Sequence, residues 1–550
     1  MSHLLEKMEE EALAAAIAAS LAESHGTEVK KKGRRSDPIS IEESPHSHQK
    51  KKRKAVTVDI SDDEIVESIG ENEPSRPSTV EESNGSPKIA WSGSPCGESF
   101  FLNSLEGIHP SGNQNCVNLR QLMDVENDLE SILCSSFSTD YKWFLTRIPS
   151  HVAVTVISHW NVNKDQEGTH VINGRLTVVH PPLLQYGNVH AKMMMLLYKK
   201  KMRLIISSAN LTEGEWEGLT QCVWYQDFPK YAGKNVDISE TEISLDFRQQ
   251  LYSFLRSVKL NPNFLNAYDF TSVKVERRTA SLSLTLHEVR LVISVSGKHH
   301  ETDAHDFGYL RMKSVLSRHF ACDSIMDSII AYQTSSLGAI CHQNWLKEFS
   351  KNVGSTTSGS AAHDVSVLFP TKNSIVKRSN MNGSDMIFLH NSHYTTAGVP
   401  KRMYDIIPKD LARKRNLLHS KIMYRTLKNE DGEVTHGWCY IGSHNLSPSA
   451  WGRYRGDFQI LNYEMGVLFV TQDPSQSNGK SCGLEWLNSL PFSTDLIPYD
   501  DDDEPWTPYL VAHSFTFEAE AGGARFEVLI DGVLCGPFIK INDPVCNTSV

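Results

Sequence analysis

The chain contains the same short pattern twice, and this repeat limits what it can fold into. In each copy a His-x-Lys triplet begins an apolar strand, a second apolar strand ends at Ser-x-Asn-Leu followed by Thr or Ser, and a Trp follows the Asn by six residues. The first copy consists of His190, Lys192, Asn210, Thr212 and Trp216, and the second of His419, Lys421, Asn445, Ser447 and Trp451. A single His-x-Lys triplet carries little information, whereas two copies with every other feature in step predict a duplicated fold.

The repeat also predicts an anion site in each half. Residues two apart on a strand face the same side of a sheet, so His190 and Lys192 project together, and the Asn that ends a pairing strand lies near that face. Thr212 and Ser447 stand where a helix N-cap belongs, and Pro448 suits the first helical position, so backbone N–H groups would point at the same anion. The alternative is that both histidines are satisfied side chains at strand edges of an ordinary duplicated fold.

Apolar strands and helical stretches alternate from about Asn118 onward, which is typical of an α/β fold. Strands are predicted at Val152–Ile157, Met193–Leu197, Leu204–Ile206 and Val289–Val295, and a helix at Glu240–Val258. Together with the repeat, this pattern predicts two similar α/β domains, each a mixed sheet flanked by helices. We place the first domain at residues 91–297 and the second at 298–513.

Residues 1–90 are of a different kind. They are rich in Ser, Glu, Pro and Lys, contain no aromatic residue and carry charge in blocks, which predicts a disordered tail. Within it, Glu9–Leu21 resembles a ubiquitin-interacting helix, Lys30–Arg35 and Lys50–Lys54 are typical of a nuclear import signal, and Val56–Glu64 resembles a SUMO-interacting strand. The alternatives are an alanine-rich helix without a partner, solvated charge runs or a contact with nucleic acid, and a chance pattern.

Composition excludes several classes of protein. No apolar run is long enough for a membrane-spanning helix, and no charged leader precedes an apolar block, so we expect neither a membrane nor a secreted protein. The ten cysteines are scattered without a CxxC pair or a Cys/His cluster, which predicts reduced thiols inside a cell and no zinc site. The net charge of −11 argues against a broad basic surface that coats duplex DNA, and leaves a local basic pocket open.

Two histidines across one phosphate can cleave a phosphodiester. One attacks as a neutral imidazole while the other, protonated, donates to the leaving oxygen, and the proton is exchanged during hydrolysis. Lys192 and Lys421, with the amides of Asn210 and Asn445, would hold the phosphate oxygens. This chemistry needs no metal or other cofactor, because the lysines supply the positive charge. The spacing does not say which histidine attacks.

The repeat resembles the paired His-Lys motifs of the phospholipase D superfamily, and departs from most of that superfamily by having Asn210 and Asn445 where Asp is usual. In this respect it is similar to the tyrosyl-DNA phosphodiesterase family, over residues 118 to about 511. The resemblance implies a DNA-repair hydrolase that cleaves the bond between a DNA 3′ phosphate and a tyrosine of trapped topoisomerase I, or other 3′ adducts, through a phosphohistidine. Residues 514–550 exceed the family pattern, and Arg525–Ile530 is either an extra strand or part of a poorly ordered tail.

The resemblance also implies roles for individual residues. His190 would be the nucleophile and His419 the general acid and then base, with Gln221 and Glu464 as supporting partners. A carboxylate on a histidine Nδ1–H makes the far nitrogen more nucleophilic, whereas a neutral amide leaves its histidine a readier acid. We therefore hypothesise that Glu464 supports His190 and that Gln221 supports His419.

The resemblance suggests further substrate contacts. Tyr186 stands where the family has an aromatic ring that stacks on a base, and Phe137 would line the other side of the site, although core packing competes for both rings. Ser335 and Ser336 lie in a stretch that resembles the family's serine-rich loop on the DNA backbone, and Ser447 would also bind substrate.

The implied partner is single-stranded or nicked DNA with a 3′-phosphotyrosyl peptide, bound by a nuclear monomer, with ubiquitin and SUMO as further partners of the tail. Two rival functions stay open: a noncatalytic adaptor that reads ubiquitin and SUMO, and another phospholipase D-type phosphodiesterase or nuclease.

Overall fold

The computed structural model describes residues 99–541 except 125–127, 161–164, 232–240, 272, 274, 279–282, 320–328, 341–343, 355–364, 379–382, 390, 396–397, 429–430, 472–483, 508–514, 521–522 and 531–532. The predicted disordered tail, with its ubiquitin-like helix, its basic runs and its SUMO-like strand, lies outside these residues. The description that follows concerns the two halves that carry the repeat, and then the C-terminal strands.

Nine described strands of the first half form one sheet in the order β2-β1-β9-β8-β7-β3-β4-β6-β5. Their bounds are β1 Phe101–Asn103, β2 Cys116–Val117, β3 Leu129–Ser136, β4 Ala153–Ser158, β5 Gly168–Val171, β6 Leu176–His180, β7 Met193–Tyr198, β8 Lys201–Ser207 and β9 Cys222–Pro229. The central strands are apolar and buried on both faces, as the run Met193–Leu196 shows. The predicted strands of this half are confirmed to within a few residues.

A second sheet of nine described strands has the order β10-β11-β22-β19-β18-β13-β15-β17-β23. Their bounds are β10 Val275–Arg278, β11 Ser283–Ser294, β13 Ile330–Gln333, β15 Val365–Leu368, β17 Met403–Asp405, β18 Ile422–Lys428, β19 Val434–Gly442, β22 Glu464–Thr471 and β23 Ile497–Pro498. The domain division predicted at 297/298 assigns β10 and β11 to the first domain, whereas their hydrogen bonds to each other and to β22 place them in the second sheet.

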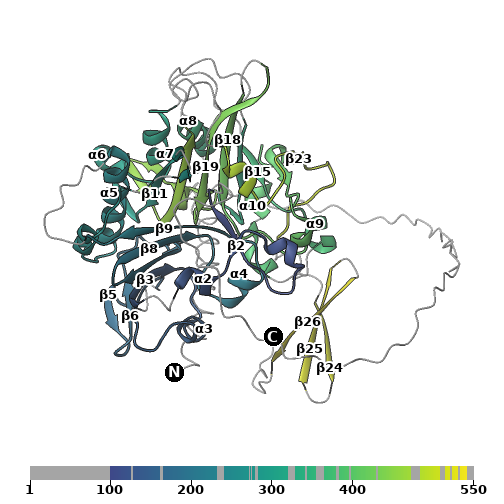
Figure 1. The fold of residues 1–550 in the computed structure, drawn as a ribbon. Coiled ribbons are helices and arrows are strands. Elements are labelled where there is room, and N and C mark those ends of the chain that lie inside the picture. Colours follow the sequence, from purple (N-terminus) through teal and green to yellow (C-terminus); the bar gives the residue numbers. More distant parts are fainter. Residues whose placement is uncertain are drawn as a thin grey trace, which may run out of the picture. The chain divides into compact units, whose positions relative to one another are not determined.

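The two sheets repeat the same topology. In the order β1-β9-β8-β7-β3-β4-β6, the first four pairings are antiparallel and the last two parallel, and the order β11-β22-β19-β18-β13-β15-β17 has the same senses. Figure 1 shows the first sheet below the second. The predicted duplication of a mixed sheet is therefore confirmed, and the hairpins β7–β8 and β18–β19 that follow each His-x-Lys are equivalent.

Helices cover the sheets and lie in the loops between strands. The described α-helices are α2 Leu119–Met123, α3 Tyr141–Thr146, α4 Glu213–Glu217, α5 Glu242–Ser257, α6 Glu301–Ala304, α7 Gly308–Leu316, α8 Trp345–Gly354, α9 Lys372–Arg378, α10 Asn391–Tyr394, α11 Pro448–Trp451 and α12 Trp486–Ser489. Helix α5, predicted from its sequence, packs on β11 and buries Phe247, Leu251 and Phe254. Short 3₁₀ turns lie at Pro110–Asn113, Pro262–Ala267, Ser384–Met386, Pro400–Arg402 and Leu411–Arg413.

One hydrophobic core runs through both halves. It joins residues of the first sheet such as Met193 and Trp224 to residues of the second such as Trp438, and Phe100 stacks on Phe469 with ring centroids 6.1 Å apart. Burial of apolar surface is the main driving force of folding, so a shared core fixes the two sheets against each other. Residues far apart in the chain can therefore meet at a defined distance.

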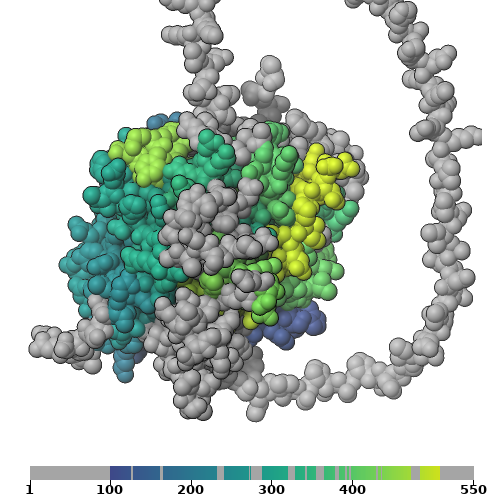
Figure 2. All heavy atoms as spheres, turned by 90° about the horizontal axis from the view of Figure 1, so that it is seen from above, coloured from purple at the N-terminus to yellow at the C-terminus, as the bar shows by residue number. Residues whose placement is uncertain are grey.

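Three smaller sheets complete the described structure. Their strands are β12 Gly297–His299 with β21 Asp457–Ile460 and β20 Arg453–Arg455, β14 Ser336–Leu337 with β16 Phe388–Leu389, and β24 Phe515–Glu520 with β25 Gly523–Ile530 and β26 Val533–Ile541. The stretch Arg525–Ile530, for which two possibilities were open, is therefore a strand. Figure 2 shows residues 484–507 in yellow on the surface beside green parts of the second half, where β23 pairs with β17. None of the described helices combines the length and the apolar character needed to cross a membrane.

Candidate active site

Two backbone hydrogen bonds join the halves, one at each histidine of the repeat. The N–H of His190 donates to the carbonyl of Tyr463 over 2.9 Å, and the N–H of His419 donates to the carbonyl of Thr220 over 3.0 Å. Tyr463 immediately precedes Glu464, and Thr220 immediately precedes Gln221. Each of these hydrogen bonds therefore brings the histidine of one half close to a polar side chain of the other half.

The first histidine is hydrogen-bonded to a buried carboxylate. His190 Nδ1 lies 2.8 Å from Glu464 Oε2, which also accepts from Ser443 Oγ over 2.6 Å, while Glu464 Oε1 accepts from Asn462 Nδ2 over 3.0 Å. Burial opposes ionisation of Glu464, but His190 and the neighbouring positive groups outweigh it and lower the pKa of the carboxyl to about 2. The carboxylate fixes the proton of His190 on Nδ1 and leaves Nε2 with its lone pair.

The second histidine has two partners, of which the sequence predicted one. Its Nδ1 lies 3.2 Å from Gln221 Nε2 and also 3.2 Å from Glu215 Oε2. The amide is oriented, because Gln221 Oε1 accepts from Ser208 Oγ over 2.6 Å. The structure therefore brings Gln221 to His419 and adds a second partner that the sequence analysis did not name, a buried carboxylate that lies equally close.

Glu215 had a weak signal in the sequence. It follows Asn210 by five residues in the first turn of α4, and the equivalent position of the second copy is Ala450, so the repeat itself gave no reason to choose it. Ser208 and Ser443 could have been found from the repeat, because each precedes the Asn of its copy by two residues. Ser208 holds Gln221, the partner of His419, and Ser443 holds Glu464, the partner of His190. The contact of Glu215 with His419 depends on the packing of one half on the other, whereas each Ser contacts its partner within its own half.

The two lysines lie inside the same cluster. Lys192 Nζ donates to the carbonyl of His190 over 2.7 Å, and Lys421 Nζ donates to the carbonyl of His419 over 2.6 Å. Burial lowers the pKa of Lys192 to about 8. Burial and the charge of Lys192 lower the pKa of Lys421 to about 7, against attraction from Glu215 and Glu464. Charges of both halves thus act on one another across a single buried site.

Both histidines bind protons weakly in the empty site. Burial, followed by the charge of Lys421, lowers the pKa of His419 to about 4, although Glu215 opposes this. Burial also lowers the pKa of His190, with Glu464 opposing it and Lys192 and Lys421 assisting it. Since opposite charge nearby favours the charged form, an anion that enters this cluster raises the pKa of each of these groups.

The two amides predicted to bind an anion have different surroundings. Asn210 is buried, accepts from the N–H of Phe137 over 3.2 Å and donates to Glu215 Oε1 over 2.6 Å. Asn445 is half-buried, and its Oδ1 accepts from Thr334 Oγ1 over 3.0 Å and from Ser335 Oγ over 3.2 Å. The acceptor oxygens are engaged in both, and the amide nitrogen of Asn210 also donates to Glu215, so only the second N–H of Asn210 can point to an anion.

The predicted substrate residues fall into two groups. Phe137 is half-buried with its ring 5.8 Å from that of His190, and Ser335 contacts Asn445, so both lie at the cluster. Tyr186 is 47 % exposed, which contradicts core packing, and it has a φ of +67°, which is unusual for a residue other than Gly. Ser336 accepts from Thr334 Oγ1 through its carbonyl, and the structure shows no bond from its side chain to the cluster.

The helix starts that follow each Asn are short. Ser447 caps α11 by accepting from the N–H of Ala450 over 3.2 Å, and Pro448 occupies its first turn, as predicted. Thr212 precedes α4 without a side-chain cap bond.

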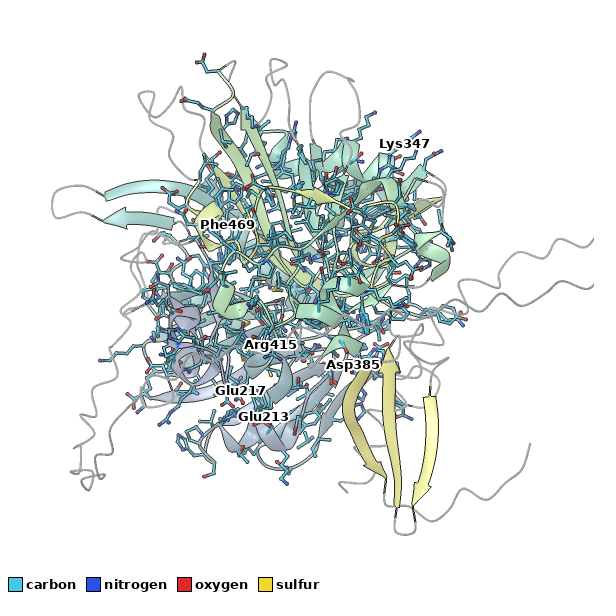
Figure 3. The ribbon with its side chains drawn as sticks, turned by 90° about the vertical axis from the view of Figure 1, so that its right-hand side faces the viewer. Glu213, Glu217, Lys347, Asp385, Arg415 and Phe469 are labelled. Atoms are coloured by element: carbon cyan, nitrogen blue, oxygen red, sulfur yellow. The ribbon has the colours of Figure 1, made fainter. Side chains whose placement is uncertain are left out.

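The His-x-Lys triplets lie just before β7 and β18 rather than within them. In the first half the strand pairing nevertheless continues to the lysine, because the N–H of Ser207 donates to the carbonyl of Lys192 over 3.0 Å. In Figure 3 the labelled Glu213 and Glu217 mark α4 on the first half, and Lys347 marks the second.

The comparisons with known proteins agree with this geometry. The tyrosyl-DNA phosphodiesterase family model matches residues 99–500. Tyrosyl-DNA phosphodiesterase 1 of Arabidopsis thaliana is 22% identical over 478 residues, covering 74% of each chain, and that of Drosophila melanogaster is 26% identical over 349 residues, covering 58% of this chain and 57% of the relative. The crystal structure of the yeast tyrosyl-DNA phosphodiesterase has 17% identity and a TM-score of 0.53, and covers 74% of this chain and 99% of its own. The chain therefore belongs to the tyrosyl-DNA phosphodiesterase family, DNA-repair phosphodiesterases of the phospholipase D superfamily.

Proposed function

We propose that this chain hydrolyses the bond between a DNA 3′ phosphate and a tyrosine of trapped topoisomerase I, through a covalent phosphohistidine on His190. The observation that carries the proposal is the buried cluster itself: two histidines, each tied at Nδ1 to a partner from the other half, with two lysines whose charges act on both. The relatives from Arabidopsis thaliana and Drosophila melanogaster are tyrosyl-DNA phosphodiesterases, which supports the same substrate class.

In the first step, Nε2 of His190 attacks the phosphorus and the bond from phosphorus to the tyrosine oxygen breaks. Glu464 on Nδ1–H increases the electron density at Nε2 and stabilises the charge that forms on the imidazole. The tyrosine oxygen leaves with a proton from His419. Lys192 and Lys421 stabilise the negative charge on the phosphate oxygens during the transfer.

In the second step, water attacks the phosphohistidine from the side of His419, which now takes up the proton. The bond from phosphorus to His190 Nε2 breaks, and a DNA 3′ phosphate is released. The entering phosphodiester adds negative charge beside the histidines and lysines, so it raises the proton affinity of His419 against Lys421. The histidine can then act as an acid in the first step.

Other contacts with the substrate are part of the proposal. Tyr186, exposed on its turn, stacks on a nucleobase, and Phe137 lines the site on the side of His190. Ser335, Ser336 and Ser447 lie along the second half, where they bind the DNA backbone. The DNA is single-stranded at its 3′ end, and the protein acts as a monomer.

The test uses single-stranded DNA with a 3′-phosphotyrosine, in the presence of EDTA, with the 3′-phosphate oligonucleotide measured on a gel. The wild-type chain should release it, His190→Ala should not, and His419→Asn should accumulate a covalent protein–DNA species. Lys347→Met, at an exposed position on α8, is the matched control and should keep full activity. Turnover by His190→Ala at the wild-type rate would reject the assignment of the nucleophile.

We also propose that the protein works in the nucleus and that its first ninety residues bind ubiquitin and SUMO. The basic runs Lys30–Arg35 and Lys50–Lys54, and the motifs at Glu9–Leu21 and Val56–Glu64, support this. Replacement of both basic runs by Ala should move a fluorescent fusion out of the nucleus. Ile17→Ala should weaken binding of the tail to ubiquitin, and a retained affinity would argue for an alanine-rich helix without a partner.

A further inference from the structure

Glu215 is a buried carboxylate inside the cluster, on a helix whose other carboxylates face outward. It is 3% exposed. Its neighbours on α4, Glu213 and Glu217, instead pair with Arg147 at 3.4 and 2.7 Å, and the side chain of Glu213 is 61% exposed. A buried carboxylate is stable only when several donors satisfy it, so the contacts of Glu215 define what it does.

Glu215 has hydrogen-bond partners on three residues. Its Oε2 accepts from the N–H of Asn210 over 2.8 Å and lies 3.3 Å from Gln221 Nε2 and 3.2 Å from His419 Nδ1, while its Oε1 accepts from Asn210 Nδ2 over 2.6 Å. Burial opposes its ionisation, but His419, Lys192 and the N–H of Asn210 outweigh this and lower the pKa of Glu215 to about 2. Glu215 is therefore an anion at neutral pH.

The surroundings of His419 decide which ring nitrogen carries its proton. Lys421 Nζ lies 3.0 Å from Nε2, and an ammonium group can only donate, so Nε2 must accept when Lys421 is charged. At the other end of the ring, a carboxylate oxygen can only accept, so Nδ1 donates to Glu215. Gln221 Nε2 also lies 3.2 Å from Nδ1, but its two N–H groups have acceptors in Oε2 and the backbone carbonyl of Glu215, 3.3 and 3.4 Å away. Both ends of the ring thus select the same tautomer, with the proton on Nδ1.

We propose that Glu215 is a positioning residue for the acid and base histidine: its carboxylate holds the proton of His419 on Nδ1, turns Nε2 toward the phosphate and stabilises the imidazolium before it donates to the leaving tyrosine. The inference rests on the proposed function and extends it, because each histidine then has a carboxylate from elsewhere in the fold, Glu464 for His190 and Glu215 for His419. The same carboxylate accepts hydrogen bonds from Asn210, so it holds the Asn210 amide and the His419 ring in a fixed position relative to each other.

The first test measures the covalent step alone, in single turnovers, with two leaving groups. Glu215→Gln should slow cleavage of the 3′-phosphotyrosyl oligonucleotide about 10- to 100-fold, the usual loss when a carboxylate behind a histidine is removed. A 3′-(4-nitrophenyl) phosphate should lose much less, because a weakly basic leaving group needs little help from an acid. Glu213→Gln, on the exposed face of α4, is the matched control and should leave both rates unchanged.

A purely structural role predicts a different result, since a distorted site would slow both substrates by the same factor, and that outcome would overturn the proposal. If the wild-type chain cleaves neither substrate, the proposed function fails instead, so the two failures are distinct. Gln still offers an oxygen to the N–H of Asn210, which favours a folded variant.

The second test measures the wild-type protein, and a variant serves only to assign its signals. In wild-type protein labelled with ¹⁵N-histidine, nitrogen NMR reports which ring nitrogen is protonated, and the signals that disappear in His419→Asn identify His419. We expect the proton on Nδ1 at neutral pH. A proton on Nε2 would refute the role of Glu215, whatever the activity.

Discussion

Nδ1 of His190 lies 2.8 Å from Oε2 of Glu464, although 274 residues separate them in the chain. The contact exists because the N–H of His190 donates to the carbonyl of Tyr463, the residue directly before Glu464, at which β22 begins. Glu464, a residue of the second half, therefore supports the histidine of the first half. Removal of its charge should affect the step in which His190 attacks.

Glu464→Gln should slow the formation of the covalent intermediate about 10- to 100-fold, because an amide neither fixes the Nδ1 proton nor stabilises the imidazolium as a carboxylate does. Single-turnover kinetics with the 3′-phosphotyrosyl oligonucleotide measure this step. Ser443→Ala removes one of the hydrogen bonds to Glu464 but keeps its charge, and should cost less. An unchanged first step in Glu464→Gln would mean that the carboxylate does not support His190.

Lys421→Met should abolish activity and raise stability. Burial and Lys192 depress the pKa of Lys421 from 10.5 to about 7, so the unfolded state binds the proton more tightly and the charged side chain destabilises the fold. The destabilisation of the fold by the charged lysine is greatest below pH 7, and it disappears as the pH rises from 7 to 10.5. At pH 6 the variant should gain more than about 1.4 kcal/mol in the free energy of unfolding, the value of one pKa unit.

The stability of Lys421→Met is measured by chemical denaturation at pH 6 and pH 10, with Lys347→Met as the control for loss of an exposed lysine. The gain should shrink at the higher pH, whereas the control should show no gain at either pH. A gain that is the same at both values would mean that Lys421 has a normal pKa.

Binding of an anion to the cluster should take up protons. In the empty site the pKa of Lys192 is about 8 and that of Lys421 about 7, and a bound anion raises both, so affinity is highest below pH 7 and falls as the pH rises through 8. Inorganic sulfate does not titrate in this range and can be used as the probe. Calorimetry at pH 8 in buffers of different ionisation enthalpy should show proton uptake, and Lys421→Met should reduce it. A sulfate affinity that is flat from pH 6 to pH 9 would contradict the lowered pKa values.

Gly187→Ala should destabilise the turn that presents Tyr186. A Cβ at Gly187 would lie 2.3 Å from the carbonyl oxygen of Leu461 and 2.9 Å from that of Leu184, and backbone atoms cannot move away cheaply. We expect a loss of roughly 1–3 kcal/mol in the free energy of unfolding. Gly174→Ala is the matched control, because its Cβ would meet nothing within 4 Å and the melting temperature should not change. An equal melting temperature for both variants would show that the turn tolerates the clash.

The local parts of this protein follow from neighbouring residues. The hairpins after His190 and His419, the N-cap at Ser447 and the helix at Glu242–Ser257 depend on apolar periodicity and on hydrogen bonds between residues close in the chain, which is why sequence patterns predicted them. The repeat also predicted that the two halves share one topology. Its residue types were enough to select phosphodiester chemistry.

The tertiary structure decided how the halves complete each other. Glu215 meets His419, and Glu464 meets His190, only because a shared core holds one sheet against the other, and no local pattern in the chain encodes that register. The same packing buries two lysines in one site and lowers their proton affinity, a property that depends on the dielectric surroundings and not on residue type. The sequence by itself therefore determined which groups carry the chemistry, and the tertiary structure determined their partners and their charges.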